Sequence, residues 1–149
     1  VREAAIKAGF TWWKFLIFNK LRLGMGYHYR NQTECICFIE KGKRKLNDLS
    51  VPDVLEVKGI RGGYPTEKPV ELSEILIRNS SEVGDTVLDM YCGSGSILHA
   101  AINQGRNAIG IDTSKTACDL TKERLSCLDC ESATLVVPRK QLSLFDMAG

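Results

Sequence analysis

The sequence predicts an α/β fold with a parallel sheet in its second half. From Thr86 onward, short apolar segments typical of buried strands alternate with segments that carry apolar residues at helical spacing. This alternation is typical of parallel strands joined by right-handed helical crossovers. The chain has 149 residues, of which 44% are hydrophobic and 26% charged, a composition that favours a folded domain over a disordered chain.

The second half divides into helices and strands at recognisable signals. Pro69 suits the first turn of a helix because it lacks an N–H group, and Gly105 suits the left-handed position after a helix. Ser114 is a good cap for the start of a helix. The predicted helices cover residues 69–79, 96–104 and 114–128, and the predicted strands cover 86–88, 107–111 and 133–137.

The first half predicts antiparallel strands. A short helix is expected over residues 2–9, and the aromatic and β-branched residues from Thr11 to Asn19 predict a strand. After a turn at residues 24–26, two further segments, 27–30 and 34–40, predict an antiparallel pair. Residues 41–45 predict a basic turn. The prolines and glycines of residues 46–65 predict a loop.

Charge is unevenly distributed along the chain. Residues 1–45 contain ten Lys or Arg and three Glu, a net charge of +7, whereas residues 46–149 have a net charge of −5. Eight of the eleven aromatic residues also lie in residues 1–45. This asymmetry suggests a polyanionic partner for the first half. The alternative is that the aromatic residues fill strands and the lysines are solvated on loops.

Other features of the sequence exclude several classes. The longest apolar run is five residues, Cys35 to Ile39, so no segment predicts a membrane span. The six cysteines include only one C-x-x-C pair, Cys127 and Cys130, with no second pair of ligands at zinc-site spacing, so no metal site is predicted. The chain begins at Val1 without a leader, so we expect an internal piece of a longer protein of the reducing cytoplasm.

The chemistry is concentrated where the first two parallel strands end. Asp89 closes one strand, and the turn that follows contains Gly93 and Gly95, which allow the backbone to approach a ligand closely. Asp112 closes the next strand, at the place where a carboxylate accepts ribose hydroxyl protons. Leu98 occupies the position of the third glycine in the dinucleotide-binding fingerprint, so that fingerprint is not matched. No Gly-Lys-Ser/Thr follows the turn, so it is not a P-loop either. We therefore expect a ligand that contains a nucleoside but is not a dinucleotide.

Two motifs resemble a known family. Thr66-Glu67-Lys68-Pro69, followed by a helix and then by Asp89-Met90-Tyr91-Cys92-Gly93-Ser94-Gly95-Ser96, is similar to the T-x-K-P and D-P-F-x-G-S-G-T motifs of the circularly permuted DNA amino-methyltransferases. Residues 26–42 resemble the family's segment after its catalytic motif. The resemblance covers roughly residues 1–128, with Met90 and Ser96 differing from the family's usual Pro and Thr.

This resemblance implies a Rossmann-like fold with a mixed sheet and S-adenosylmethionine as cofactor. It implies methyl transfer to the exocyclic amine of adenine or cytosine in double-stranded DNA, as in restriction-modification. Asp89 and the backbone of residues 92–94 would hold the methionine part of the cofactor, Asp112 its ribose, and Thr66 and Lys68 its carboxylate. The full set of implied cofactor-binding residues is Thr66, Lys68, Pro69, Asp89, Cys92, Gly93, Ser94, Gly95 and Asp112.

The basic first part is the expected DNA contact. Its candidate phosphate-binding residues are Lys14, Lys20, Arg22, Arg30, Lys43, Arg44 and Lys45. Residues 1–45 would belong to the catalytic, DNA-facing subdomain, and residues 46–65 would form a linker or short target-recognition segment. Residues 66–149 would form the cofactor-binding subdomain.

The family's catalytic tetrapeptide, [D/N/S]-P-P-[Y/F/W], is absent from the chain, so no catalytic residue is predicted. The resemblance implies that it lies before Val1, on a central strand between the one that ends at Asp89 and the one that contains Trp12 and Trp13. We therefore expect the carboxyl-terminal part of a bacterial or phage enzyme, which needs the upstream part of its own polypeptide and is inactive alone. A homodimer stays open, as do two other functions: an inactive cofactor- or DNA-binding module, and a methyltransferase for RNA or protein.

Overall fold

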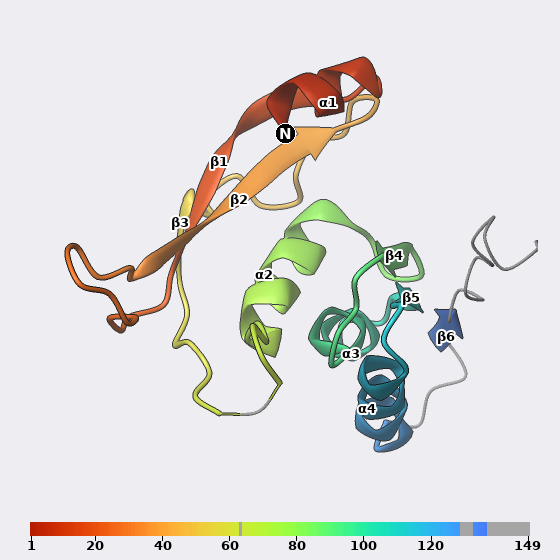
Figure 1. Ribbon diagram of the computed structural model, residues 1–149. Coiled ribbons are helices and arrows are strands. Elements are labelled where there is room, and N and C mark those ends of the chain that lie inside the picture. The colour runs from red at the N-terminus through yellow and green to blue at the C-terminus, as the bar shows by residue number, and fades with distance from the viewer. Residues whose placement is uncertain (63, 129–132, 137–149) are drawn as a thin grey trace, which may run out of the picture. The chain divides into compact units, whose positions relative to one another are not determined.

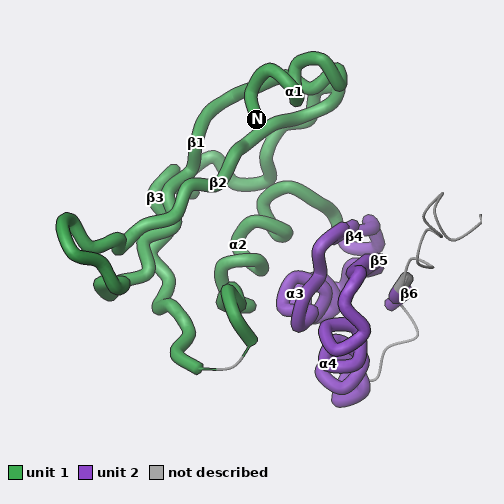
Figure 2. Tube along the Cα trace, in the orientation of Figure 1, with its two compact units in different colours: residues 1–82 green, residues 83–149 purple. Residues whose placement is uncertain are grey.

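The computed structural model describes residues 1–62, 64–128 and 133–136. The chain divides into two compact units, residues 1–82 and residues 83–149, each with its own sheet of three strands (Figures 1 and 2). None of the described helices is long and apolar enough to cross a membrane.

The first unit is a sheet with one helix against it. Its elements are α1 (Arg2–Lys7), β1 (Thr11–Asn19), β2 (Thr33–Glu40), β3 (Val54–Glu56) and α2 (Val70–Ser80). The central strand β1 runs antiparallel to β2 and parallel to β3. The core lies between the sheet and α2, where Phe18, Leu55 and Leu72 are at most 4% exposed. Burial of each such side chain contributes about 1.5–3 kcal/mol and anchors α2 to the sheet.

The structure corrects the predicted strand over residues 27–30. β2 pairs with β1, and residues 27–30 belong instead to the connection between these two strands. The reason is a local closure: the Gly24 N–H donates to the Asn31 carbonyl at 2.7 Å, and Arg30 Nε donates to the Gly24 carbonyl at 2.8 Å. These bonds fold the connection back on itself before a strand ladder can form.

A short strand lies within the predicted loop of residues 46–65. β3 pairs with Ile17–Asn19 of β1, and its Leu55 enters the core. A further strand is expected beside the strand of Trp12 and Trp13. Among the described residues, β1 pairs with β2 along one edge and with β3 on the other edge only at Ile17–Asn19. The second edge of β1 at Trp12 and Trp13 and the outer edge of β2 are therefore unpaired there.

The second unit has the predicted parallel arrangement. Its elements are β4 (Thr86–Asp89), α3 (Ser96–Asn103), β5 (Asn107–Ile111), α4 (Lys115–Ser126) and β6 (Ala133–Val136). All neighbouring strands are parallel, in the order β4-β5-β6. The Ser114 side chain caps α4 by accepting the Ala117 N–H, as predicted, whereas Val137 of the predicted third strand lies outside the described residues.

Close packing of α3 on the sheet brings its first turn to the ends of the strands. Leu98 of α3 is fully buried, and its side chain occupies the space that a Cβ at Gly110 of β5 would need. Glycine at this position has no Cβ, so α3 can pack closely against β5. The turn from β4 into α3 therefore meets the carboxyl end of β5, within one unit.

Candidate functional site

The carboxylate of Asp112 joins the ends of two neighbouring strands. Its Oδ2 accepts the Gly93 N–H at 2.9 Å, and its Oδ1 accepts the Ser114 N–H at 2.8 Å. The Cys92 N–H donates to the Ile111 carbonyl at 3.0 Å, which ties the same turn to β5. The sequence predicts that Asp89, Gly93 and Asp112 lie at the carboxyl ends of two neighbouring strands, and the structure brings them together there.

The turn between β4 and α3 depends on its glycines. Gly93 has φ 54° and Gly95 has φ 76°, both in the left-handed region that favours glycine. A Cβ at Gly95 would lie 2.8 Å from Cγ2 of Thr121 and 2.9 Å from its Oγ1. Gly95 is therefore required by internal packing.

Thr121 of α4 supports this turn and was not among the residues predicted from the sequence. Its side chain is fully buried, and its Oγ1 donates to the Gly93 carbonyl at 2.9 Å. A signal was present: Thr121 is a polar residue on the helical stripe that includes Cys118 and Leu125. A buried hydroxyl on an apolar stripe needs a hydrogen-bond partner, and here the partner is the glycine turn.

Burial changes the acid–base behaviour of the turn. The Asp89 carboxyl is half-buried and accepts the Tyr91 N–H at 3.0 Å. Burial, with a smaller contribution from the Asp112 charge, raises the pKa of Asp89 above its ordinary value. Burial likewise raises the pKa of the Cys92 thiol, so this cysteine is a packing residue rather than a nucleophile. The Ser94 side chain is also buried.

A second candidate site lies entirely within the first unit. A cavity of about 340 Å³ is lined by three cations, Lys20, Arg22 and Lys68, and by two acids, Glu34 and Glu67. Tyr64, Thr66 and Pro69 are also among its lining residues. This cavity thus contains all three residues of the T-E-K-P motif that were predicted to contact a ligand.

Glu34 organises the charges of this cavity. Its Oε2 lies 2.7 Å from Lys68 Nζ and its Oε1 lies 3.4 Å from Lys20 Nζ. The hydrogen bond from Lys68 is the main cause that holds the pKa of Glu34 below its ordinary value. Glu34 was not among the residues predicted from the sequence. The available signal was its position as one of only three acids among residues 1–45.

Thr66 has an unusual backbone conformation just before α2. Thr66 has φ 62°, which is rare for a β-branched residue, and its hydroxyl donates to the Pro65 carbonyl at 2.6 Å. Strained conformations of this kind cluster at ligand-binding sites. Pro69 is buried and is the residue immediately before the first turn of α2, one position earlier than predicted.

Apart from Arg44, which is described below, the predicted phosphate-binding residues divide into two groups. Lys14, Lys20, Arg22 and Arg30 already have partners: Asp53, Glu34 and the carbonyl groups of Ile60 and Gly24, respectively. Lys43 and Lys45 are exposed and make no hydrogen bond or ion pair within the described residues. They are therefore the predicted contacts with the most freedom to meet a phosphate.

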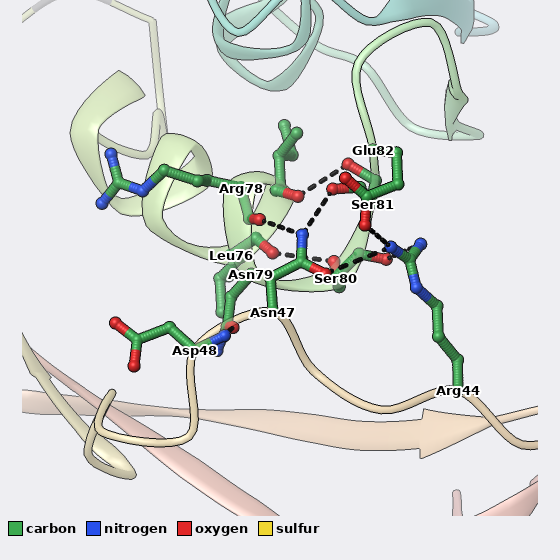
Figure 3. A network of polar contacts seen from close by, with 10 residues as sticks. Arg44, Asn47, Asp48, Leu76, Arg78, Asn79, Ser80, Ser81 and Glu82 are labelled. Atoms are coloured by element: carbon green, nitrogen blue, oxygen red, sulfur yellow. Dashed lines mark hydrogen bonds and ion pairs between the residues drawn. The ribbon is translucent and has the colours of Figure 1, made fainter.

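Arg44 belongs to a polar network at the end of α2 (Figure 3). Its guanidinium donates to the Ser80 carbonyl at 3.0 Å and to Glu82 Oε1 at 2.7 Å. Asn47 donates to the carbonyls of Arg78 and Ser81 at 2.8 and 2.9 Å. Together these side chains satisfy carbonyl groups that the last turn of a helix leaves unpaired.

The cysteines show no metal-binding arrangement among the described residues. No group of three His, Cys, Asp or Glu side chains there could hold a metal ion. Cys35, Cys37, Cys92, Cys118 and Cys127 are all free thiols, and Cys130 of the C-x-x-C pair lies outside the described residues.

Comparison with known proteins gives a consistent result. Residues 48–123 match the model of the N6/N4-type DNA methylase family. Type II methyltransferase M2.DpnII of Streptococcus pneumoniae is 41% identical, over 66% of this chain and 44% of that protein. Type II methyltransferase M.HhaII of Haemophilus parahaemolyticus is 31% identical, over 65% of this chain and 44% of that protein.

The fold is also found among solved structures. The crystal structure of the M1.HpyAVI–SAM complex superposes with a TM-score of 0.71 and 28% identity, and covers 83% of this chain and 66% of that one. The expected Rossmann-like methyltransferase fold is therefore confirmed. The chain spans about half the length of the curated relatives it matches.

Proposed function

Because the chain belongs to the N6/N4-type DNA methylase family, we propose that it is part of a site-specific DNA methyltransferase. The protein transfers a methyl group from S-adenosylmethionine to the exocyclic amine of adenine or cytosine in double-stranded DNA. The observation that carries this proposal is the bond from Gly93 N–H to Asp112, which aligns a glycine turn with an acid at the ends of two parallel strands.

The chemistry of Asp112 fits the ribose of this cofactor. A carboxylate offers about four lone-pair positions, and the N–H groups of Gly93 and Ser114 use one on each oxygen. Each oxygen can therefore accept one further hydrogen bond, and a ribose has two neighbouring hydroxyl groups to donate. The network thus holds the Asp112 carboxylate in place while acceptor capacity remains.

The cavity of the first unit fits an amino-acid carboxylate. The Lys68 ammonium has three donors and uses one of them on Glu34, so it can also bind a ligand carboxylate. Thr66 adds a hydroxyl at the same cavity, and its single O–H, which donates to the Pro65 carbonyl in this structure, would rotate to donate to the ligand. We propose that these residues, with Pro69 in support, bind the carboxylate of the cofactor.

Asp89 and the backbone of Cys92, Gly93 and Ser94 would bind the methionine part, with Gly95 as the glycine that permits the turn. The cofactor supplies an electrophilic methyl group on a sulfonium. The chain's own residues contribute by binding and orientation, which bring an amine nitrogen and the methyl group into line.

We further propose the permuted order of the family and an upstream catalytic part. The T-E-K-P motif precedes the glycine turn in this chain, and the relatives are about twice as long as the matched region. The tetrapeptide and its strand would be supplied by the preceding part of the same polypeptide. Among the described residues this sheet has two unpaired edges, along residues 11–16 of β1 and along β2, and both are suitable places for an added strand.

Methyl transfer from labelled S-adenosylmethionine tests this proposal. The full-length natural protein should label double-stranded DNA on adenine N6 or cytosine N4, and should label RNA and protein at least tenfold more slowly. The 149-residue chain alone should transfer no label. Calorimetry on the full-length protein separates the alternatives: an inactive binding module would bind the cofactor without transfer to any of the three substrates. Faster labelling of RNA or protein than of DNA would contradict the proposal.

A further inference from the structure

The connection between β1 and β2 exposes large apolar side chains. We call residues 20–32 the β1–β2 loop; in Figure 1 it extends beyond the paired part of the two strands. Met25 and Tyr27 are 96% exposed and Tyr29 is 100% exposed. Leu21 and Leu23 of the same loop are more than half exposed. An apolar concentration of this size on one loop indicates an interaction surface.

The loop is held in one shape by its own hydrogen bonds. The Lys20 N–H donates to the Gln32 carbonyl at 2.9 Å, and Gly24 and Asn31 are joined at 2.7 Å. A Cβ at Gly24 would lie 2.8 Å from the Asn31 carbonyl oxygen, so this closure requires glycine. Leu21 has φ 54°, a strained conformation that is stabilised by the bond from its N–H to Asn19 Oδ1 at 3.1 Å. Strain of this kind is retained where it positions a functional segment.

The exposure of Tyr27 and Tyr29 shows that their rings protrude from the loop and do not line a pocket. A side chain that lines a pocket is partly covered by the other walls of that pocket, but Tyr27 and Tyr29 are almost uncovered. Among the described residues, the ring of Tyr27 contacts the ring of His28 in a T-shaped arrangement, at 4.9 Å between centroids. These rings therefore protrude, as a wedge does, and their faces are available for stacking.

The charge of the loop favours a nucleic acid over a protein as partner. Residues 20–32 contain no Asp or Glu, and of their three cations Lys20 and Arg22 line the charged cavity of the first unit, whereas Arg30 is exposed on the loop. Arg30 is exposed and donates its Nε N–H to the Gly24 carbonyl. The N–H groups of its two Nη atoms therefore remain available to a phosphate. Protruding aromatic rings beside basic side chains are typical of elements that stack on unpaired bases while they follow a phosphate backbone.

We propose that Tyr27 and Tyr29 of the β1–β2 loop insert into DNA and stack on the bases left unpaired when the target base leaves the duplex. This inference rests on the proposed function, because an amine inside a duplex is inaccessible until its base is extruded. Insertion fills the gap in the stack and keeps the base out. The loop thus acts on the DNA around the target and not on the target's own ring.

The test compares two duplexes of the same sequence, one intact and one with a single abasic site. In the abasic duplex the cost of opening a gap is already met, so a wedge binds it more tightly. We expect the full-length protein to bind the abasic duplex at least fivefold more tightly, by fluorescence anisotropy. The double variant Tyr27→Ala/Tyr29→Ala should lose this preference and bind the abasic duplex about tenfold more weakly.

Two further variants control this experiment. Tyr27→Phe/Tyr29→Phe keeps both rings and should keep the preference. Lys43→Gln should weaken binding to the two duplexes by the same factor, because it removes only a charge. An equal loss on both duplexes with the alanine variant, or no loss, would overturn the proposal.

Two results separate this proposal from its alternatives. If the alanine variant leaves both DNA affinities unchanged but alters the unfolding temperature or the molecular mass in solution, the loop is a protein contact and the proposal is wrong. Labelled methyl transfer by the same wild-type preparation reports separately on the proposed function. Transfer without an abasic preference overturns the wedge alone, whereas absence of both overturns both.

Discussion

The Gly93 N–H and Asp112 Oδ2 lie 2.9 Å apart and join the turn after β4 to the residue after β5. Nineteen residues separate the two in the chain. The second oxygen of Asp112 is held by the Ser114 N–H at the start of α4. The acid that is proposed to bind a ribose is thus also a structural link between two turns.

Asp112→Asn should weaken both roles of this residue. An amide has one oxygen, so one of the two N–H donors loses its acceptor and faces an NH₂ group. We expect a loss of about 1.5–3 kcal/mol in the free energy of unfolding, measured by urea denaturation. Cofactor affinity, measured by calorimetry, should fall more than tenfold. Asp119→Asn is the matched control because Asp119 is exposed and its ion pair with Lys115 lies in solvent, so this variant should leave the free energy of unfolding unchanged. Equal effects of the two variants on stability, with an affinity change under twofold, would contradict both roles.

Gly95→Ala should be considerably more destabilising than Gly84→Ala. Both glycines have positive φ, 76° and 87°, so each substitution carries a backbone cost of about 1–2 kcal/mol. At Gly84 the added Cβ meets nothing within 4 Å, whereas at Gly95 it meets Thr121 at 2.8 Å. Overpacking adds about 1–3 kcal/mol at Gly95 only. The difference between the two unfolding free energies isolates this contact, and a difference near zero would show that Thr121 moves aside freely.

The parallel half of the fold was predictable because its signals are local. Glycine after a helix, serine before one and short buried strands are each encoded within a few residues, so β4, β5 and their helices have nearly the predicted bounds. The antiparallel half was harder because pairing depends on distant residues. Nothing near Val54–Glu56 shows that this segment adds a third strand beside β1. Residues 27–30 were mispredicted for another reason: the bonds of Gly24 with Arg30 and Asn31 that fold them back are local but have no sequence motif.

The candidate site shows the same division. Asp89, Gly93 and Asp112 follow from strand ends and were predicted, and the structure places them together. Glu34 and Thr121 were missed because their importance comes from contacts with residues 34 and 28 positions away, Lys68 and Gly93. A residue whose role is to hold another has no motif of its own.

Asp89→Asn should stabilise the protein at neutral pH. Burial raises the folded-state pKa of Asp89 above its ordinary value of 3.8, so the folded protein binds the proton more tightly than the unfolded chain does. The stability contributed by the protonated carboxyl is present below pH 3.8 and is lost as pH rises through the raised pKa. Asparagine stays neutral and still accepts the Tyr91 N–H, so the variant avoids this loss.

The pH dependence of the free energy of unfolding distinguishes an effect of Asp89 ionisation from an effect of packing. The unfolding free energy of Asp89→Asn should exceed that of wild type at pH 7, and the difference should shrink towards zero below pH 3.8. Cofactor affinity at pH 7 should fall, since the methionine part loses a charged partner. A constant difference across the whole pH range would show that packing, not ionisation, separates the two proteins.

Arg44→Gln should reduce the stability of the protein and leave DNA binding unchanged, whereas Lys43→Gln, at the neighbouring residue, should do the reverse. Arg44 donates to the Ser80 carbonyl at the end of α2 and to Glu82, and its charge lies at the negative end of the helix (Figure 3). Its loss should reduce the free energy of unfolding by about 1 kcal/mol, because exposed hydrogen bonds and ion pairs each contribute little. Lys43 has no partner within the described residues, so its loss should leave stability unchanged.

The salt dependence of DNA binding should change with Lys43→Gln and not with Arg44→Gln. A lysine that contacts a phosphate releases about one counterion, so Lys43→Gln should reduce the slope of log affinity against log salt by about 1. Arg44→Gln should leave this slope unchanged, since the guanidinium is held by the end of α2 in the absence of DNA. Urea denaturation and anisotropy titrations at several salt concentrations measure the two effects on the same samples. A reduced slope for Arg44→Gln at unchanged stability would instead make Arg44 a phosphate contact and its network at the end of α2 incidental.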